Sequence, residues 1–196
     1  MGRPRAFDPD RALAAALDLF WRKGFEGTSL SDLTGAMGIS RPSLYGAFGN
    51  KERLFRLVLD RYQATCMSFF EEALRQPTAR RMVERLLYGF ADAQTDRVHP
   101  PGCLGTSGAL ACSEAADPIR TELIAHRATQ EVALRQRLQR AVAEHDLPAA
   151  TDVADLAGYV MTLVQGMSVQ SASGADREML YGIVRTALRA WPEAAA

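Results

Sequence analysis

The sequence predicts an all-α protein, in which an N-terminal unit of three short helices precedes a larger helical bundle. Two observations support this fold class. Apolar residues recur at helical spacing through most of the 196 residues, and capping or helix-ending residues separate one such segment from the next. The clearest segment runs from residue 28 to residue 55 and indicates a helix, a tight turn, a helix and the start of a longer helix.

The first helix expected in this segment carries Leu30, Leu33 and Met37 on one face. Gly38 is expected to end it, because glycine readily accepts the left-handed conformation that closes a helix. Ser40 can then cap the next helix by accepting a hydrogen bond from a backbone N–H. Together these residues predict two short helices that are joined by a turn.

The second helix is expected to pack Leu44 and Phe48 against the first. Pro42 falls in its first turn, where a missing N–H does no harm. Small, polar and basic residues remain on the opposite face, namely Arg41, Ser43, Tyr45, Gly46 and Ala47. Two short helices of this kind are typical of a helix-turn-helix.

The helices on either side of this motif can also be read from their caps. Asp8 and Pro9 are expected to open a first helix, and Gly24 to end it. After the motif, Asn50 is expected to act as a cap, and the apolar spacing predicts one long helix from Lys51 to about Gln76. We therefore divide the chain into residues 1–50 and residues 51–196, with the long helix joining the two domains.

The remaining segments predict four further helices. They are expected at residues 79–94, from residue 117 to about residue 145, at 152–170 and at 177–191. Asp117 and Pro118 are interpreted as the cap and first turn of the second of these. Its arginines are interpreted as a solvated outer face because glutamates interleave with them. These arginines are Arg120, Arg127, Arg135, Arg137 and Arg140.

Charge and composition narrow the class of function. The net charge is zero, but residues 1–56 hold nine Lys or Arg and six Asp or Glu, so this end is basic. Such a distribution is typical of a protein that contacts nucleic acid at one end. We expect a cytoplasmic protein with reduced thiols, because there are only three cysteines, no membrane-length apolar run and no secretory signal.

The sequence offers no convincing catalytic or cofactor site. His99, His126 and His145 are scattered and lack the spacing of metal ligands on a helix. The glycines at 105 and 108 lack the lysine of a phosphate-binding loop. We therefore expect neither an enzyme nor a metal or cofactor site, and an enzyme built on a helical bundle is the weaker alternative.

The N-terminal residues resemble the DNA-binding domain of the TetR (tetracycline-repressor-like) family of bacterial regulators. The matching pieces are Trp21-Arg22-Lys23-Gly24-Phe25, Thr28-Ser29-Leu30, Leu44-Tyr45-Gly46-Ala47-Phe48 and Asn50-Lys51-Glu52. The resemblance covers roughly the first 60 residues and is looser beyond them. It implies a ligand-responsive regulator, more specifically a repressor, that a small effector releases from a palindromic operator in double-stranded DNA.

The pose of a helix-turn-helix on DNA assigns roles to the predicted surface. Arg41 is expected to read a guanine or, alternatively, to bind a phosphate or remain a solvated surface charge. Pro42, Ser43 and Gly46 would make close contacts at the groove. The expected phosphate contacts are Thr28, Ser29, Ser31, Tyr45 and Lys51, with a core ring as the alternative role of Tyr45. Arg3 and Arg5 belong to a basic arm that either follows the minor groove or is an unstructured terminus.

Two expectations concern the second domain. Residues 152–191 carry apolar residues over more than one helix face, and the family resemblance implies that this helix pair forms a homodimer, with a buried position in one chain as the alternative. Cys103 follows Pro101 and Gly102 at an expected helix start. It is a candidate electrophile or oxidant sensor, and otherwise a packed apolar side chain. Alternatively, Cys103, Cys112 or Cys66 could form a copper(I) site with Met67, Met161 or Met167.

Overall fold

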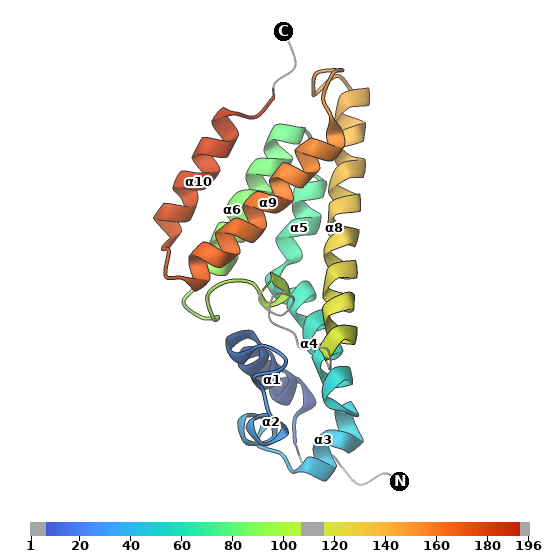
Figure 1. The fold of residues 1–196 in the computed structure, drawn as a ribbon, viewed down its shortest axis with the longest axis vertical. Helices are drawn as coiled ribbons and strands as arrows, with labels where there is room; N and C mark the ends of the chain where they lie inside the picture. Colours follow the sequence, from blue (N-terminus) through green and yellow to red (C-terminus); the bar gives the residue numbers. More distant parts are fainter. Residues whose placement is uncertain (1–6, 107–115, 193–196) are drawn as a thin grey trace.

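The computed structural model describes residues 7–106 and 116–192, and the regular elements in these ranges are α-helices (Figure 1). The N-terminal unit at the bottom of Figure 1 holds α1 (Pro9–Lys23), α2 (Leu30–Met37) and α3 (Arg41–Phe48). Helix α4 (Lys51–Cys66) runs from this unit into an upper bundle. The bundle contains α5 (Ser68–Leu74), α6 (Ala79–Gln94), α8 (Asp117–Ala143), α9 (Val153–Ala172) and α10 (Arg177–Arg189). The all-α prediction is confirmed.

The caps predicted for the N-terminal unit are present. The Asp8 carboxylate accepts hydrogen bonds from the first backbone N–H groups of α1, and the Ser40 hydroxyl does the same at α3. The Asn50 side chain accepts from the first turn of α4. Gly38 closes α2 with φ 66° and ψ 32°, the left-handed conformation that glycine adopts without steric cost. These local signals place α1 to α4 in the order that the sequence predicts.

Three aromatic rings hold α4 against the N-terminal unit. Phe55 of α4 meets the rings of Phe20 and Phe25 edge-on, with centroids 5.1 and 5.3 Å away. Leu33 of α2 and Leu44 of α3 are fully buried in the same apolar core. Edge-to-face contacts of this kind stabilise a core beyond the area that they bury. The first part of α4 is therefore structurally a member of the N-terminal unit.

The prediction of one helix from Lys51 to about Gln76 is wrong. α4 ends at Cys66, because Met67 has φ −115° and ψ 11°, outside the helical region, and α5 begins at Ser68. Phe69 and Phe70 are buried as predicted, but they belong to α5. The bend directs Phe69 toward α6, where its ring packs edge-on against Phe90 with centroids 5.0 Å apart.

Two details predicted for α8 are wrong. Its cap position is Ala116, without a side-chain cap, and Asp117 is the first helical residue, whose carboxylate accepts from Arg120 Nε at 2.9 Å. Arg137 does not lie outward: it is 5% exposed, and its Nη2 donates to the carbonyl oxygen of Gln76 at 2.8 Å. That carbonyl follows α5, so Arg137 ties α8 to the α5–α6 turn, and burial lowers the pKa of its guanidinium.

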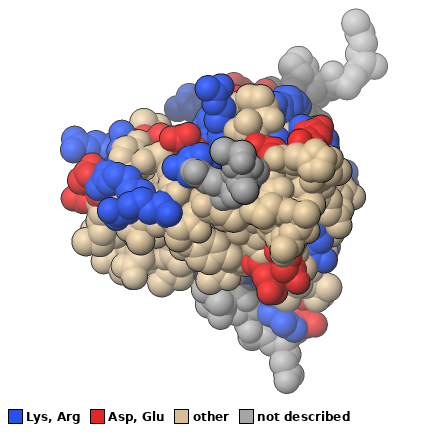
Figure 2. Space-filling model, turned by 90° about the horizontal axis from the view of Figure 1, so that it is seen from above, with Lys and Arg blue, Asp and Glu red and all other residues tan. Residues whose placement is uncertain are grey.

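The other predicted arginines of α8 are at least partly exposed, and acidic side chains accompany several of them. Arg135 pairs with Glu131 and Arg140 with Glu144. Figure 2 views the molecule from above relative to Figure 1 and shows basic and acidic side chains interspersed on this upper face. Within the described ranges, no helix is long and apolar enough to cross a membrane.

Candidate nucleic-acid interface and internal cavity

The outward face of α3 carries the residues that the sequence predicts for it. Arg41, Pro42, Tyr45 and Gly46 are exposed, and Ser43 is half-buried. Tyr45 is 49% exposed, so its ring lies on the surface and does not take its alternative role in the core. Leu44 and Phe48 on the opposite side are buried, so the amphipathic division of α3 is as expected.

Arg41 joins α3 to α2. It is the first residue of α3, and its Nη2 lies 3.5 Å from the Ser31 hydroxyl oxygen of α2. Both side chains are exposed, so this contact is weak and open to solvent. A guanidinium at this end of a second helix can reach either a base edge or a phosphate.

The entry of α2 is built around Ser29. Its hydroxyl accepts from the Asp32 backbone N–H at 3.0 Å, while the Asp32 carboxylate accepts from the Ser29 backbone N–H at 3.0 Å. This reciprocal capping box leaves Ser29 exposed at a helix N-terminus, where a phosphate is favourable. Lys23 approaches the same carboxylate at 3.2 Å.

Thr28 does not lie on this surface. Its side chain is fully buried, and its hydroxyl donates to the Gly24 carbonyl oxygen at 2.7 Å. The hydroxyl therefore supplies a donor to the carbonyl oxygen that ends α1, and it is directed away from solvent. The sequence shows a Thr-Ser pair at a helix entry but does not show which of the two faces inward. Because Thr28 is buried, it is not among the proposed DNA contacts.

Lys51 lies at the start of α4 with its Nζ 4.3 Å from the centroid of the Phe25 ring. Partial burial lowers the pKa of its ammonium group. The ring holds the Lys51 side chain beside the N-terminus of α4, a position that suits a phosphate contact. Arg3 and Arg5, the other basic candidates, lie outside the described residues.

Gly46 gives a test that separates stability from DNA contact. A Cβ at this position meets no atom within 4 Å, and the same holds for Gly35 in α2. Each change to alanine is therefore expected to raise the unfolding free energy by about 0.5–1 kcal/mol. Only Gly46→Ala is expected to weaken DNA binding, because the methyl group separates α3 from the groove. Urea unfolding and fluorescence anisotropy on a duplex measure the two effects. Equal DNA affinities of the two variants would contradict a close backbone approach at Gly46.

Asp32 should make stability depend on acidity. The hydrogen bond from the Ser29 backbone N–H, followed by the Ser29 hydroxyl and Lys23, lowers the Asp32 pKa below its ordinary value of 3.8. A lowered folded-state pKa stabilises the fold above that ordinary value, and the contribution is lost as the pH falls through the folded-state pKa. As the pH falls below about 4, the free energy of unfolding of Asp32→Asn should therefore decrease less than that of wild type, as measured by urea unfolding. Asp60→Asn, an exposed site on α4, is the control, and identical pH slopes for Asp32→Asn and wild type would exclude the effect.

An internal cavity lies where α4, α6, α8 and α9 meet. Its volume is about 30 Å³, room for roughly one water molecule. Apolar side chains and a few uncharged polar ones form most of the described wall. They include Leu59, Tyr62, Gln63, Met67, Cys103, Leu123, Gln130, Met161 and Gln165, and the cationic Arg127 also lines the cavity.

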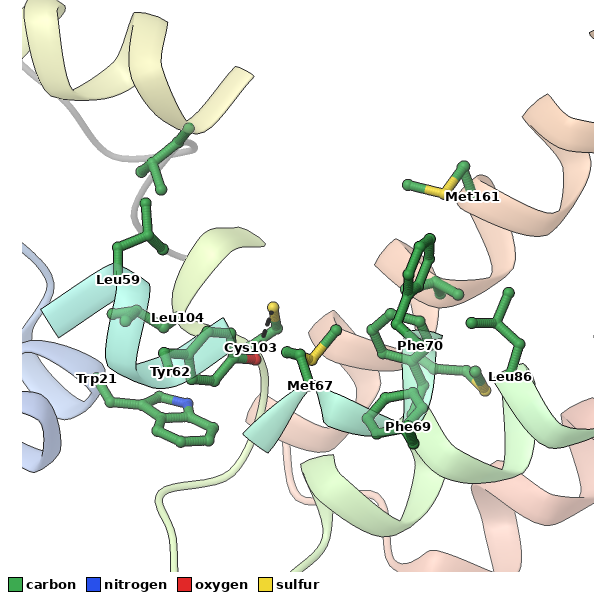
Figure 3. Close-up of a cluster of buried hydrophobic side chains, with 14 of the residues drawn as sticks. Trp21, Leu59, Tyr62, Met67, Phe69, Phe70, Leu86, Cys103, Leu104 and Met161 are labelled. Atoms are coloured by element: carbon green, nitrogen blue, oxygen red, sulfur yellow. Dashed lines mark hydrogen bonds between the residues drawn. The ribbon is translucent and has the colours of Figure 1, made fainter. Parts of the chain in front are cut away.

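Tyr62 connects this cavity with the N-terminal unit. Figure 3 shows its ring between Trp21 of α1 and Cys103, and its hydroxyl donates to Cys103 Sγ at 3.2 Å. The ring of Trp21 meets Tyr62 edge-on at 4.9 Å and stacks on His99 at 5.6 Å. Tyr62 lines the cavity and its ring touches Trp21, so a displacement of the Tyr62 ring would act directly on α1.

Cys103 lies in the cavity wall, and the described helix after it begins at Leu104. It is 8% exposed. Burial raises the pKa of the half-buried Cys66 thiol, which makes that thiol less reactive at neutral pH. Cys112 lies outside the described residues. Among the residues that the structure describes, no group of three His, Cys, Asp or Glu side chains could hold a metal ion.

Two family descriptions match this chain. Residues 12–58 match the description "Bacterial regulatory proteins, tetR family", and residues 78–188 match "Tetracyclin repressor-like, C-terminal domain". The chain belongs to the TetR family. This confirms the resemblance seen in the N-terminal residues and extends it through most of the bundle.

The TetR-family relatives include two repressors of Escherichia coli strain K12. HTH-type transcriptional repressor ComR is 38% identical over 98% of this chain and 92% of that protein. HTH-type transcriptional repressor BdcR is 44% identical over 43% of this chain and 44% of that protein. A cysteine-substituted form of the TetR family regulator CifR, solved with 26-base-pair operator DNA, is 42% identical. Its match covers 97% of this chain and 100% of that one, with a TM-score of 0.93.

These findings make this TetR-family chain a DNA-binding transcriptional regulator and not an enzyme. The choice of Arg41, Pro42, Ser43, Tyr45 and Gly46 as contact residues stays a prediction. Sequence reasoning missed the cavity residues Tyr62 and Arg127, because helical spacing marks a face as apolar or polar without showing which helices share it. The aromatic character of Trp21 and Tyr62 is visible in the sequence, but their contact across 41 residues is not.

Proposed function

We propose that the protein is a homodimeric repressor that leaves a palindromic operator when a small effector occupies the internal cavity. The observation that carries this proposal is the exposed face of α3 together with the likeness to CifR, whose structure contains operator DNA. Such a regulator would work in the cytoplasm, where its DNA target is.

The dimer would form through α9 and α10. Many of their apolar residues are buried within the chain, but Tyr159, Val169 and Met179 are 41%, 49% and 57% exposed. Large exposed apolar side chains on neighbouring helices are a feature of interaction surfaces. A two-fold pair of chains would place two α3 helices in successive major grooves, about 34–36 Å apart.

The effector would act by shifting the population between two arrangements of the N-terminal unit. Ligand in the cavity would displace the Tyr62 ring, and Trp21 would pass that displacement to α1. A ligand shifts such an equilibrium only by as much as its affinities for the two states differ. The effector would therefore bind more tightly to the arrangement whose α3 spacing no longer fits the operator.

DNA selection followed by affinity measurement tests the proposal. The purified protein is incubated with a pool of random duplexes, and a labelled copy of the selected site is titrated by fluorescence anisotropy at several salt concentrations. We expect two protomers per duplex in sedimentation and affinity that falls steeply with salt, because phosphate contacts release counterions. A monomer, or no duplex bound at low ionic strength, would refute the proposal. DNA affinity that no ligand changes would instead favour an architectural protein.

A further inference from the structure

The charge in the cavity wall indicates what kind of molecule the cavity takes. Arg127 of α8 lines the cavity and is half-buried, yet it forms no ion pair with any described residue. The acidic residues nearest to it on α8 are engaged elsewhere. Glu131 pairs with Arg135 at 2.9 Å, and Glu122 pairs with Arg56 of α4 at 2.7 Å. Arg127 is therefore a cation without a counter-ion inside the described part of the chain.

The rest of the described wall carries no acid. It combines apolar side chains, such as Leu59, Leu123 and Met161, with the imidazole of His126 and the uncharged amides of Gln63, Gln130 and Gln165. A partly desolvated guanidinium gains most from a carboxylate, which accepts two parallel hydrogen bonds from it. An ammonium group in the same position would meet like charge without compensation. The wall thus selects by charge as well as by apolar surface.

A route into the cavity lies between α4, α5 and α8. A groove of about 570 Å³ runs there, and it shares Gln63, Met67, His126 and Gln130 with the cavity. Gln130 Nε2 donates to Gln63 Oε1 at 3.4 Å across this boundary, a long and weak hydrogen bond. The acids at the groove are already paired, Glu71 with Arg75 and Glu72 with Arg85. The groove therefore places no unpaired charge in the path of an anion.

The cavity must widen to hold more than a water molecule. Met67, which follows α4, and Met161 of α9 are both buried and line the cavity. Methionine side chains change shape easily because they are unbranched. Met67 also occupies the break between α4 and α5, where the backbone leaves the helical conformation. The alkyl chain of a ligand can thus displace the methionine side chains and occupy the space between the helices without breaking a strong hydrogen bond.

We propose that this cavity binds a mostly apolar molecule with a carboxylate group, which enters between α4 and α8 and pairs with Arg127. The inference rests on the proposed function only in taking the ligand to be the effector. Arg127 is the specificity-determining residue, and Gln63 and Gln130 separate to admit the molecule. The carboxylate replaces solvent around the guanidinium, and the apolar body contacts Leu59, Leu123 and Met161.

Calorimetry with three matched probes tests the ligand class on the full-length protein without DNA. Octanoate, 1-octanol and octylammonium share one alkyl chain and differ in the charge of the head group. We expect octanoate to bind about tenfold or more tighter than the other two, because a charge-assisted hydrogen bond contributes more than a neutral one. Equal affinities, tighter octylammonium binding, or no binding of octanoate would overturn the proposal.

Substitutions assign the preference to Arg127. Arg127→Met keeps the apolar stem and should abolish the advantage of octanoate over 1-octanol, whereas Arg127→Lys should keep part of it. Arg140→Met, an exposed site on the same helix, should leave all three affinities unchanged. Circular dichroism melts establish that each variant is folded. An octanoate preference that survives in Arg127→Met would overturn the assignment.

A second measurement separates this inference from the proposed function. The operator duplex is titrated with protein in the presence of saturating octanoate. Binding of octanoate with the expected preference, but with unchanged DNA affinity, would refute the effector role of the cavity and leave its ligand class standing. Loss of DNA affinity that is also abolished in Arg127→Met would support both.

Discussion

Replacing Phe55 with alanine is expected to lower the free energy of unfolding by about 3–5 kcal/mol. The side chain is 1% exposed, and its ring meets two other rings edge-on, those of Phe20 and Phe25. The change removes these ring contacts and leaves a cavity that the surrounding helices can fill only in part. Urea unfolding followed by circular dichroism measures the decrease.

Tyr45→Ala is the matched control for Phe55→Ala. Its ring is 49% exposed on the adjoining helix, so its removal should change the unfolding free energy by no more than about 0.5 kcal/mol. Similar decreases in both variants would show that Phe55 does not hold α4 to the N-terminal unit. A broadened or two-step transition for Phe55→Ala would instead report separate unfolding of that unit.

Replacing Arg41 with alanine is expected to weaken operator binding by about 1–3 kcal/mol for each half-site, which is the discrimination of a good bidentate contact to guanine. Binding to a scrambled duplex of equal length should fall much less, because phosphate contacts carry no sequence information. Fluorescence anisotropy on both duplexes at one fixed salt concentration gives the comparison. The fold should be unaffected, since the side chain is exposed and its only described hydrogen bond is to Ser31 at 3.5 Å.

Arg140→Ala removes the same charge far from the predicted interface and should leave both duplex affinities nearly unchanged. Equal decreases in affinity for operator and scrambled DNA in Arg41→Ala would assign Arg41 to the phosphate backbone. The salt dependence of binding then gives an independent check, because its slope falls by about one for each phosphate that the variant no longer neutralises.

The sequence predicts the N-terminal unit more fully than the bundle, and the reason is local chemistry. Ser40, Gly38 and Asn50 act within one helical turn of themselves, so their roles can be read without knowledge of the fold. The family resemblance then predicts that α3 contacts DNA. The same reasoning locates Ser29 at a helix entry but cannot show that the neighbouring Thr28 is buried.

The errors in the bundle share another cause. Met67 interrupts a helical pattern that contains no proline or glycine, because packing of Phe69 on α6 outweighs continuation of the helix. Arg137 is buried because a carbonyl oxygen 61 positions earlier in the chain needs a donor. Contacts over such separations leave no periodic signal. That Arg127 lines the cavity without an ion pair to any described residue is visible only when α8 is placed against the cavity.

The position of Phe55 also limits how the chain can be divided. We infer that a truncated fragment ending at residue 50 would expose Phe20 and Phe25 to water, since Phe55 of α4 packs against both in the whole protein. Any autonomous DNA-binding fragment would need to include α4 at least as far as Leu59, which is buried together with Leu54 and Val58. Domain-exchange chimaeras between relatives should therefore be joined beyond that point, so that each recognition unit keeps its own α4.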